Sequence, residues 1–261
     1  MNNRMIKSIG LAALFGAVAI TSHADVTLFQ DNFEGTNLVK WIGKSGAPIN
    51  GQIVADPLNP ANHVLTFTAV NFSGDMFTAT PLDVSRPRHY VLSFDFLGAP
   101  SAVENGGFIG ISQTPTGDDS QQVWIGGTAP GAITAPPGVG TVLIVDAHWH
   151  HYDIDITPVI DAKDLLQTLL MLEDWYAFGT GLPGDAYFDN IKLVGVFDVN
   201  TVVAQVPCSG PTPTTKWKNH GAYVSTVSAV AQAYLAANII TPEEVRQITD
   251  IAGKSDCGNK K

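Results

Sequence analysis

Short strand-like runs separated by turn-forming clusters dominate the sequence from Asp25 to about Val199. The runs are rich in Val, Ile, Phe and Tyr, and the clusters between them are rich in Gly, Pro, Asn and Asp. Many short strands with such punctuation are typical of an antiparallel sandwich or barrel. The sequence therefore predicts a mainly β domain over residues 25–199. The runs are VTLFQ (26–30), HVLTFTAV (63–70), HYVLSFDFL (89–97), GFIGIS (107–112), QVWIGG (122–127), TVLIVDA (141–147), HYDIDIT (151–157) and AYFDNIKLVGV (186–196).

One segment of this region, DAKDLLQTLLMLEDW (161–175), fits two structures. Its leucines could line a helix, but TLLMLEDW (168–175) also has the composition of a buried strand, and periodicity alone does not separate the two. Because sandwiches pair continuous apolar runs in their interior, we predict a short helical turn followed by a strand.

The first 24 residues have the pattern of a secretory signal peptide. Arg4 and Lys7 form a positive region, Ile9 to Ile20 form an apolar core, and Ser22-His23-Ala24 resembles a small-x-small cleavage site. A membrane anchor is the alternative, but the apolar run is too short to span a bilayer comfortably. We therefore expect a mature chain that starts at Asp25, has no transmembrane segment, and is secreted or resides in the periplasm or at the cell surface.

The negative net charge of the chain disfavours some classes of binding partner. The formal charge of the chain is -10, and removal of the two basic leader residues makes the mature chain more acidic still. Binding to nucleic acid or to anionic membranes needs clustered Lys and Arg, so we expect no nucleic-acid partner. The acidity suits neutral ligands and divalent cations.

Composition changes after Asn200. The segment VPCSGPTPTTK (206–216) is rich in Pro, Thr and Ser, and we interpret residues 200–217 as a linker. Beyond it, residues 218–261 predict two helices. Thr241 can cap the second helix, Pro242 fits its first position, and Glu244 completes a capping box.

The chain has two cysteines, Cys208 and Cys257. In an exported protein such a pair predicts a disulfide, because the CxxC spacing of zinc and thiol redox sites is missing. It would close a loop of about 50 residues, worth about 4 kcal/mol in the chain-entropy model. We therefore expect a small helical module that depends on its disulfide.

Three motifs carry a resemblance to a known fold family. They are DNFEGTNLVKW (31–41), HWHHYDIDIT (148–157) and the closing run GDAYFDNIKL (184–193). Together they resemble the β-jelly roll of carbohydrate-binding modules, the galactose-binding-like fold. The resemblance implies an antiparallel β-sandwich (jelly roll) over residues 25–199, followed by the two-helix module. It also implies a polysaccharide or glycoconjugate as partner.

The same resemblance implies a structural calcium ion that ties the first strand to the last. Glu34 (or Asp31) and Asp189 correspond to its side-chain ligands, and backbone carbonyls from Thr36 to Lys40 would complete the shell. Calcium favours several oxygen ligands and tolerates irregular geometry. The alternative is that Asp189 only points outward on an alternating strand; we expect the calcium site.

The C-terminal segment WKNHGAYVSTVSAVAQAYLAANIITPEEVRQITDIAGKSDCG (217–258) also resembles a small module on secreted proteins of environmental bacteria. Members often carry a further Cys where this chain has Thr226. That resemblance implies an extracellular address and no particular chemistry. The stretch KWKNHG (216–221) is either a recognition loop or the entry to a helix, and we favour the helix entry.

Histidines in the second motif raise the question of a zinc or copper site. His148 and His150 share a face if the segment is a strand. They also share parity with Tyr152, so we expect them to face inward, and we expect His151 to face outward. We therefore interpret this run as an architectural strand in which Trp149 packs.

Two aromatic groups are candidates for stacking against sugar rings. Trp124 follows Gln122 and precedes a long Gly/Pro-rich loop, and Trp175 and Tyr176 lie beside another Gly-rich stretch. Aromatic rings bind the apolar faces of sugars, while polar loop side chains satisfy hydroxyls. Each of these rings could instead pack in the sandwich, where Trp and Tyr are common.

No complete catalytic motif is present. Glu173-Asp174 and Asp118-Asp119 could supply acid-base pairs for a glycosidase, but solvated loop carboxylates are the simpler interpretation. Neither the ExDxxE pattern of jelly-roll glucanases nor a GxSxG elbow occurs.

The sequence thus favours an exported, non-catalytic protein that binds a glycan or another extracellular matrix component. Two alternatives remain open, namely a polysaccharide hydrolase or lyase and a structural protein of the envelope or biofilm. The scarcity of arginine after the leader disfavours a lyase acting on acidic polymers.

Overall fold

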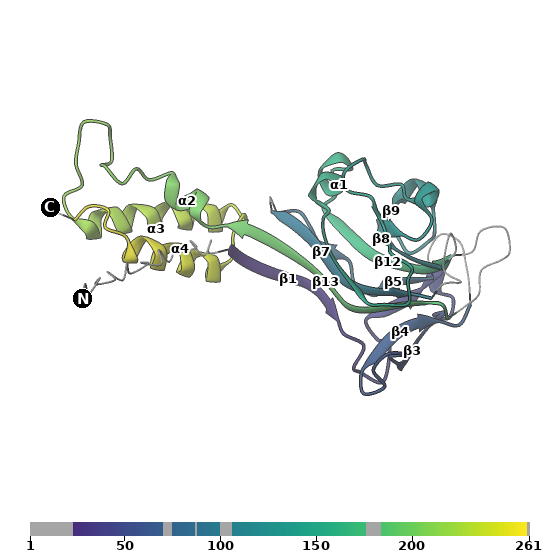
Figure 1. Cartoon of the computed structure of the whole chain (residues 1–261). Helices are drawn as coiled ribbons and strands as arrows, with labels where there is room; N and C mark the ends of the chain where they lie inside the picture. The colour runs from purple at the N-terminus through teal and green to yellow at the C-terminus, as the bar shows by residue number, and fades with distance from the viewer. Residues whose placement is uncertain (1–22, 70–74, 87, 100–105, 176–183, 260–261) are drawn as a thin grey trace, which may run out of the picture.

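A β-sandwich and a helical module make up the computed structural model, which describes residues 23–69, 75–86, 88–99, 106–175 and 184–259 (Figure 1). Two strands, β1 and β13, extend from the sandwich toward the helices and join the two parts. The predicted signal peptide lies outside the described residues except for His23 and Ala24. These two residues begin β1 and pair with Asp198 and Phe197.

Sheet A, the first layer of the sandwich, is antiparallel and has the strand order β11-β7-β13-β4-β3. The long strand β13 also pairs with β1 along its second half. The chain thus brings its first and last strands together, as the jelly-roll prediction requires. The strands of this sheet are β1 (His23–Asp31), β3 (Gly51–Ala55), β4 (His63–Phe67), β7 (His89–Gly98), β11 (His150–Asp155) and β13 (Ala186–Asp198).

Sheet B, the second layer, has the order β10-β9-β8-β12-β5-β2, and β6 pairs with β12. Its pairs are antiparallel except for the short parallel contact between β10 and β9. The strands are β2 (Trp41–Gly43), β5 (Met76–Thr78), β6 (Leu82–Asp83), β8 (Gly106–Ser112), β9 (Gln122–Gly127), β10 (Thr141–Val142) and β12 (Gln167–Trp175).

The main core lies between the two sheets. Alternate residues of each strand point inward, so β7 contributes Phe94 and Phe96, while β13 contributes Phe188. The ring of Phe188 lies 5.1 Å from that of Phe96 and 6.1 Å from that of Phe94. Sheet B faces them with Ile109 and Leu170. The predicted mainly β sandwich is therefore confirmed.

The ambiguous segment 161–175 has the predicted order of elements. Helix α1 (Thr157–Ala162) is followed by strand β12. Leu170 packs in the core between the sheets, whereas Met171 packs in a smaller cluster on the outer face of sheet B. Both faces of β12 are therefore covered, which explains why the run shows no polar alternation.

The helical module has its own core. It contains α2 (Asn200–Ala204), α3 (His220–Ala236) and α4 (Pro242–Lys254). The predicted capping box is confirmed, because Thr241 Oγ1 accepts from the Glu244 N–H and the Glu244 carboxylate accepts from the Thr241 N–H. Helix α2 occupies the start of the segment predicted as a linker, and its Val202 is buried in the module core. The described part of the chain has no helix long and apolar enough to cross a membrane.

The predicted disulfide is also confirmed. Cys208 and Cys257 are bonded across a sequence separation of 49 residues. The bond fastens the segment after α2 to the segment after α4. It therefore closes the module at the end farthest from the sandwich (Figure 1).

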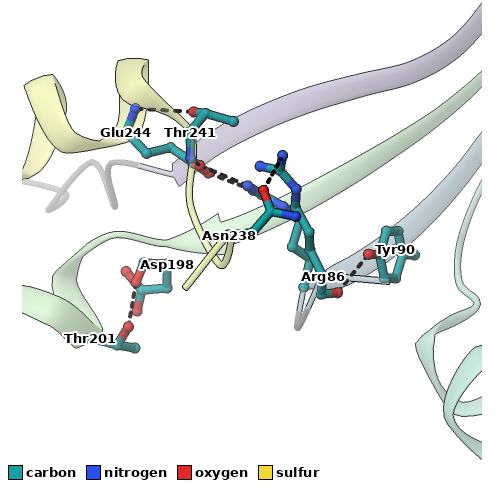
Figure 2. Close-up of polar contacts among 8 residues, drawn as sticks. Arg86, Tyr90, Asp198, Thr201, Asn238, Thr241 and Glu244 are labelled. Atoms are coloured by element: carbon teal, nitrogen blue, oxygen red, sulfur yellow. Dashed lines mark hydrogen bonds and ion pairs between the residues drawn. The ribbon is translucent and has the colours of Figure 1, made fainter. Parts of the chain in front are cut away.

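A buried ion pair joins the module to the sandwich. The Arg88 guanidinium donates to both carboxylate oxygens of Glu244 at 2.5 and 2.7 Å, and both side chains are 1% exposed. The same guanidinium lies 5.8 Å from the centre of the Phe197 ring. Figure 2 shows a second contact beside it, from Arg86 to the Asn238 side chain at 3.1 Å. The ion pair and these neighbouring contacts connect the module to the sandwich beyond the β1–β13 ribbon.

Candidate functional site

A bulge in β13 is the centre of the candidate site. The pairing of β13 with β7 shifts register between Asp189 and Lys192, and Asn190 has a φ of 50°. A bulge of this kind redirects side chains and often occurs beside functional sites. Here Asp189 and Asn190 meet polar groups on the outer face of sheet A, opposite Phe188. We call this set the polar belt; it comprises Glu34, Asp56, Asn62, His63, Asp95, Trp149, His151, Asp189 and Asn190.

Hydrogen bonds connect the belt from Trp149 to the bulge. The indole Nε1 of Trp149 donates to the Asp56 carboxylate at 3.1 Å. The Asn62 amide then donates to Asp56 at 3.3 Å and to Asp189 at 3.0 Å. The Trp149 side chain is partly exposed, so an aromatic ring borders a row of planar polar groups. These groups come from residues far apart in the sequence.

A second branch of the belt centres on Asp95. Its carboxylate contacts His151 Nδ1 at 2.6 Å and accepts from the Asn190 amide at 2.7 Å. The contact with Asp95 raises the pKa of His151, because the carboxylate favours the protonated imidazole. The prediction that His151 faces outward is confirmed, since its side chain is exposed.

Asp189 is a buried carboxylate without an ion-pair partner among the described residues. It is 5% exposed, and burial raises its pKa above the ordinary value. Hydrogen bonds from Asn62 and the Asn190 N–H oppose this effect, whereas the charges of Asp95 and Glu34 add to it. The site is therefore electrostatically favourable for a cation.

A hollow of about 310 Å³ adjoins the belt at Asn190. Most of the residues around it have polar side chains, and they come chiefly from the end of β1 and from the bulge. Lys40 lies in its wall and donates to the Gln30 carbonyl at 2.7 Å. The lining consists of Gln30, Asp31, Asn32, Lys40, Asn190, Ile191 and Lys192.

The predicted calcium ligands occupy two different environments. Glu34 lies close enough to Asp189 to raise its pKa, and it contacts His63 at 3.2 Å. Asp31 instead accepts from the Trp41 indole at 2.8 Å and from the Phe33 N–H at 3.2 Å. Within the described ranges, no group of three or more His, Cys, Asp or Glu residues is arranged to hold a metal. The residues thus offer two carboxylates, Glu34 and Asp189, and the calcium site stays a prediction.

The predicted stacking residue Trp124 lies on the outer face of sheet B and is 8% exposed. Its ring packs edge-to-face on Phe108 at 5.8 Å. The segment 129–135 is held on β9 by hydrogen bonds to the Trp124 carbonyl and packs against this cluster. Gln122 is buried as well. Stacking of a sugar on Trp124 would require that segment to move.

The other predicted stacking residues lie at the limit of the described chain. The Trp175 backbone ends β12, but its side chain and all of Tyr176 lie outside the described residues. The acid-base candidates Glu173 and Asp174 are buried in the structure, at 2% and 0% exposure. Neither carboxylate is accessible to a polymer in this conformation.

The prediction that His148 faces inward is wrong. Strand β11 begins only at His150, so the period of two does not extend to His148, whose side chain is 75% exposed. Both histidines contact Asp146 instead. Trp149 was expected to be a packing residue, and sequence reasoning missed its bond to Asp56. Asp56 lies in the turn cluster DPLNPAN (56–62), so no strand pattern indicated it.

Comparisons with known proteins give similarities of structure only. No family model and no curated protein matches the chain. The xylan-binding CBM22-1 domain of Paenibacillus barcinonensis Xyn10C has a TM-score of 0.39 at 12% identity, covering 66% of this chain and 96% of that one. The K1 cleaved adhesin domain of Lys-gingipain from Porphyromonas gingivalis gives 0.35 at 12%, covering 64% and 97%. The family 11 carbohydrate-binding module of Clostridium thermocellum, solved with a mixed-linked tetrasaccharide, gives 0.33 at 16%, covering 66% and 95%.

Proposed function

We propose that this chain is an exported, non-catalytic protein that binds a glycan along the outer face of sheet A. The observation that carries the proposal is the hydrogen-bonded path from Trp149 through Asp56 and Asn62 to the β13 bulge. It places a partly exposed ring beside carboxylates and amides and ends at a hollow of about 310 Å³. Ligand sites commonly combine an apolar surface with a few oriented polar groups.

The chemistry of the belt matches that of a sugar. Each sugar hydroxyl both donates and accepts, and the belt supplies both functions through Asp95, Asn190 and His151. The network among these side chains fixes their orientation before a ligand binds, which lowers the entropic cost of association. The ring of Trp149 supplies a surface for the C–H face of a sugar.

Replacing Trp149 with Ala is expected to weaken glycan binding at least tenfold, a change of about 1.4 kcal/mol. The variant removes both the ring and the N–H donor, whereas Trp149→Phe keeps a smaller aromatic ring and loses the donor. We therefore expect Trp149→Phe to bind with intermediate affinity. The measurement is retention on insoluble xylan, cellulose and chitin together with a glycan array.

His148→Ala is the matched control for this experiment. His148 precedes Trp149, is mostly exposed, and contacts Asp146 rather than the belt. It should bind like the unmodified chain and retain its melting temperature. The two Trp149 variants lose the bond to Asp56, so their binding is measured well below their own melting temperatures. Equal binding by Trp149→Ala and the unmodified chain would contradict the proposal, as would failure of the unmodified chain to retain any glycan.

We also propose that calcium stabilises the site through Glu34 and Asp189. Asp189 supports this proposal because its carboxylate is buried and has no cationic partner among the described residues, and because the negative charge of Glu34 lies nearby. Backbone carbonyls of residues 36–40 would complete the oxygen shell that calcium prefers. A bound ion would neutralise the two carboxylates and link the segment after β1 to β13.

We expect the unmodified chain to have a higher melting temperature in the presence of calcium than in the presence of a chelator. At 100 times the dissociation constant the stabilisation would be about 2.7 kcal/mol. Asp189→Asn should abolish this calcium-dependent shift, because it removes a ligand charge. Asp153→Asn, which changes an exposed carboxylate on the same sheet, should retain it. A calcium shift of equal size in Asp189→Asn and the unmodified chain would rule out the site.

A further inference from the structure

The disulfide forms one wall of a hollow in the helical module, far from the polar belt. The hollow has a volume of about 440 Å³, within the range typical of small-ligand sites. It lies between the segment that follows α2 and the segment that follows α4. We call it the disulfide pocket; its lining is Cys208, Ser209, Lys216, Trp217, Asp256, Gly258 and Asn259.

Close backbone packing fixes the walls of the disulfide pocket. A side chain at Gly210 would place its Cβ 1.7 Å from the Thr215 carbonyl oxygen, so only glycine allows this approach. Gly258 has a φ of 76° and lies against the Asn219 backbone. Together with the disulfide, these contacts hold the two segments side by side.

Trp217 is anchored in this pocket. Its Nε1 donates to the Pro207 carbonyl at 2.9 Å, and its ring packs edge-to-face on Tyr223 with centroids 5.7 Å apart. The side chain nevertheless remains partly exposed. A tryptophan fixed on two sides and open on another is pre-organised for stacking, since little rotamer freedom is lost on binding.

Two charged side chains flank Trp217 without internal partners. In the described part of the chain, neither the Lys216 ammonium nor the Asp256 carboxylate makes a hydrogen bond or an ion pair. Lys216 can only donate and Asp256 can only accept, while Ser209 and Asn259 can do both. The charges of the lining cancel, so the pocket favours an uncharged ligand with hydroxyl groups.

We propose that the disulfide pocket is a second saccharide site, which binds a neutral pyranose with one face on the Trp217 ring. Lys216 donates to one ring hydroxyl, and Asp256 accepts from another. This site lies in the helical module and does not depend on the polar belt. Two sites on one chain would let the protein hold a polymer at two places, which increases avidity without new contacts.

The indole N–H resonance of Trp217 provides a site-specific test in the full chain. We expect titration with xylohexaose, cellohexaose or chitohexaose to shift this resonance for at least one of the three. Lys216→Gln combined with Asp256→Asn should weaken that titration at least tenfold. Both residues are exposed and lack internal partners, so the double variant should keep its melting temperature. Lys218→Gln, an exposed neighbour outside the pocket, is the matched control.

Several results would overturn the second site. These are no shift with any of the three hexasaccharides, an unchanged titration in the double variant, or a shift that only a charged oligosaccharide or a peptide produces. Trp149→Ala separates this site from the belt, since it should leave the Trp217 titration unchanged. Loss of belt binding with an intact Trp217 response, or the reverse, shows which of the two proposals fails.

Discussion

Replacing Glu244 with Ala is expected to destabilise the protein by about 3–5 kcal/mol. The Arg88 guanidinium would remain at a position where its side chain is 1% exposed, without the carboxylate that now accepts from both of its terminal nitrogens. The α4 capping box would also lose its carboxylate, leaving the Thr241 N–H without that acceptor. The measurement is the free energy of unfolding in urea.

Glu243→Ala is the control, because Glu243 precedes Glu244 in the same helix turn and pairs with Arg246 on the surface. An exposed pair of this kind is screened by solvent and contributes little to stability. Replacing both buried partners, as in Arg88→Met with Glu244→Leu, should cost less than Glu244→Ala alone, since no buried charge is left. Equal losses for Glu243→Ala and Glu244→Ala would contradict the role assigned to the buried pair.

The same pair predicts a response to acid. Burial acts to raise the pKa of Glu244, but the contacts with Arg88 and Thr241 outweigh it and lower that pKa below its ordinary value. A carboxylate with a lowered folded pKa adds stability above its unfolded pKa, and the protein loses that stability as pH falls through the folded value. Acid therefore weakens the contact between Glu244 and Arg88 that attaches the module to the sandwich.

Glu244 shows what the sequence can and cannot predict. Its role in the capping box follows from its position three residues after Thr241, a local pattern. Its second partner, Arg88, lies 156 residues away, and no spacing rule connects them. The same holds for Asp189 and Asn62, which are 127 residues apart. Local elements were therefore predictable, whereas the contacts that build the site depend on the register of distant strands.

The tryptophans make the same point for the binding surface. Trp124 and Trp149 both lie next to loops; the sequence made Trp124 a candidate platform that could instead pack in the core, and made Trp149 a packing residue. Which ring is exposed depends on what covers each sheet face. The segment 129–135 covers Trp124, whereas Trp149 lies on the outer face of sheet A and bonds to Asp56. A strand pattern predicts which side chains share a face, but it does not predict which face is covered.

Asp174 gives the second large expected effect, a dependence of stability on pH. Its side chain is fully buried, and burial, followed by the nearby Asp185 charge, raises its pKa to about 8. The Gly184 N–H donates to one carboxylate oxygen at 3.3 Å, and the other oxygen has no hydrogen-bond partner. The folded state therefore holds a proton that the unfolded state loses near the ordinary pKa of 3.8.

The sign of the effect follows from this proton. Because the folded pKa is raised, the stabilisation is complete at low pH and is lost as pH rises toward about 8. One proton corresponds to a slope of at most about 1.4 kcal/mol per pH unit across that window. Asp174→Asn removes the titrating group and keeps the shape of the protonated acid. The Asn side chain is uncharged at every pH, so residue 174 adds no negative charge to this buried region at pH 8.

We therefore expect Asp174→Asn to be more stable than the unmodified chain at pH 8 and to lose this advantage as pH falls toward 4. The measurement is urea unfolding at several pH values across that range, with Asp153→Asn as the control for an exposed carboxylate. Asp153→Asn should run parallel to the unmodified chain, because the Asp153 side chain is 63% exposed and its contact with His151 is a surface ion pair of small effect. If Asp174→Asn also runs parallel to the unmodified chain, the Asp174 carboxyl group does not hold an extra proton in the folded state, and the prediction is wrong.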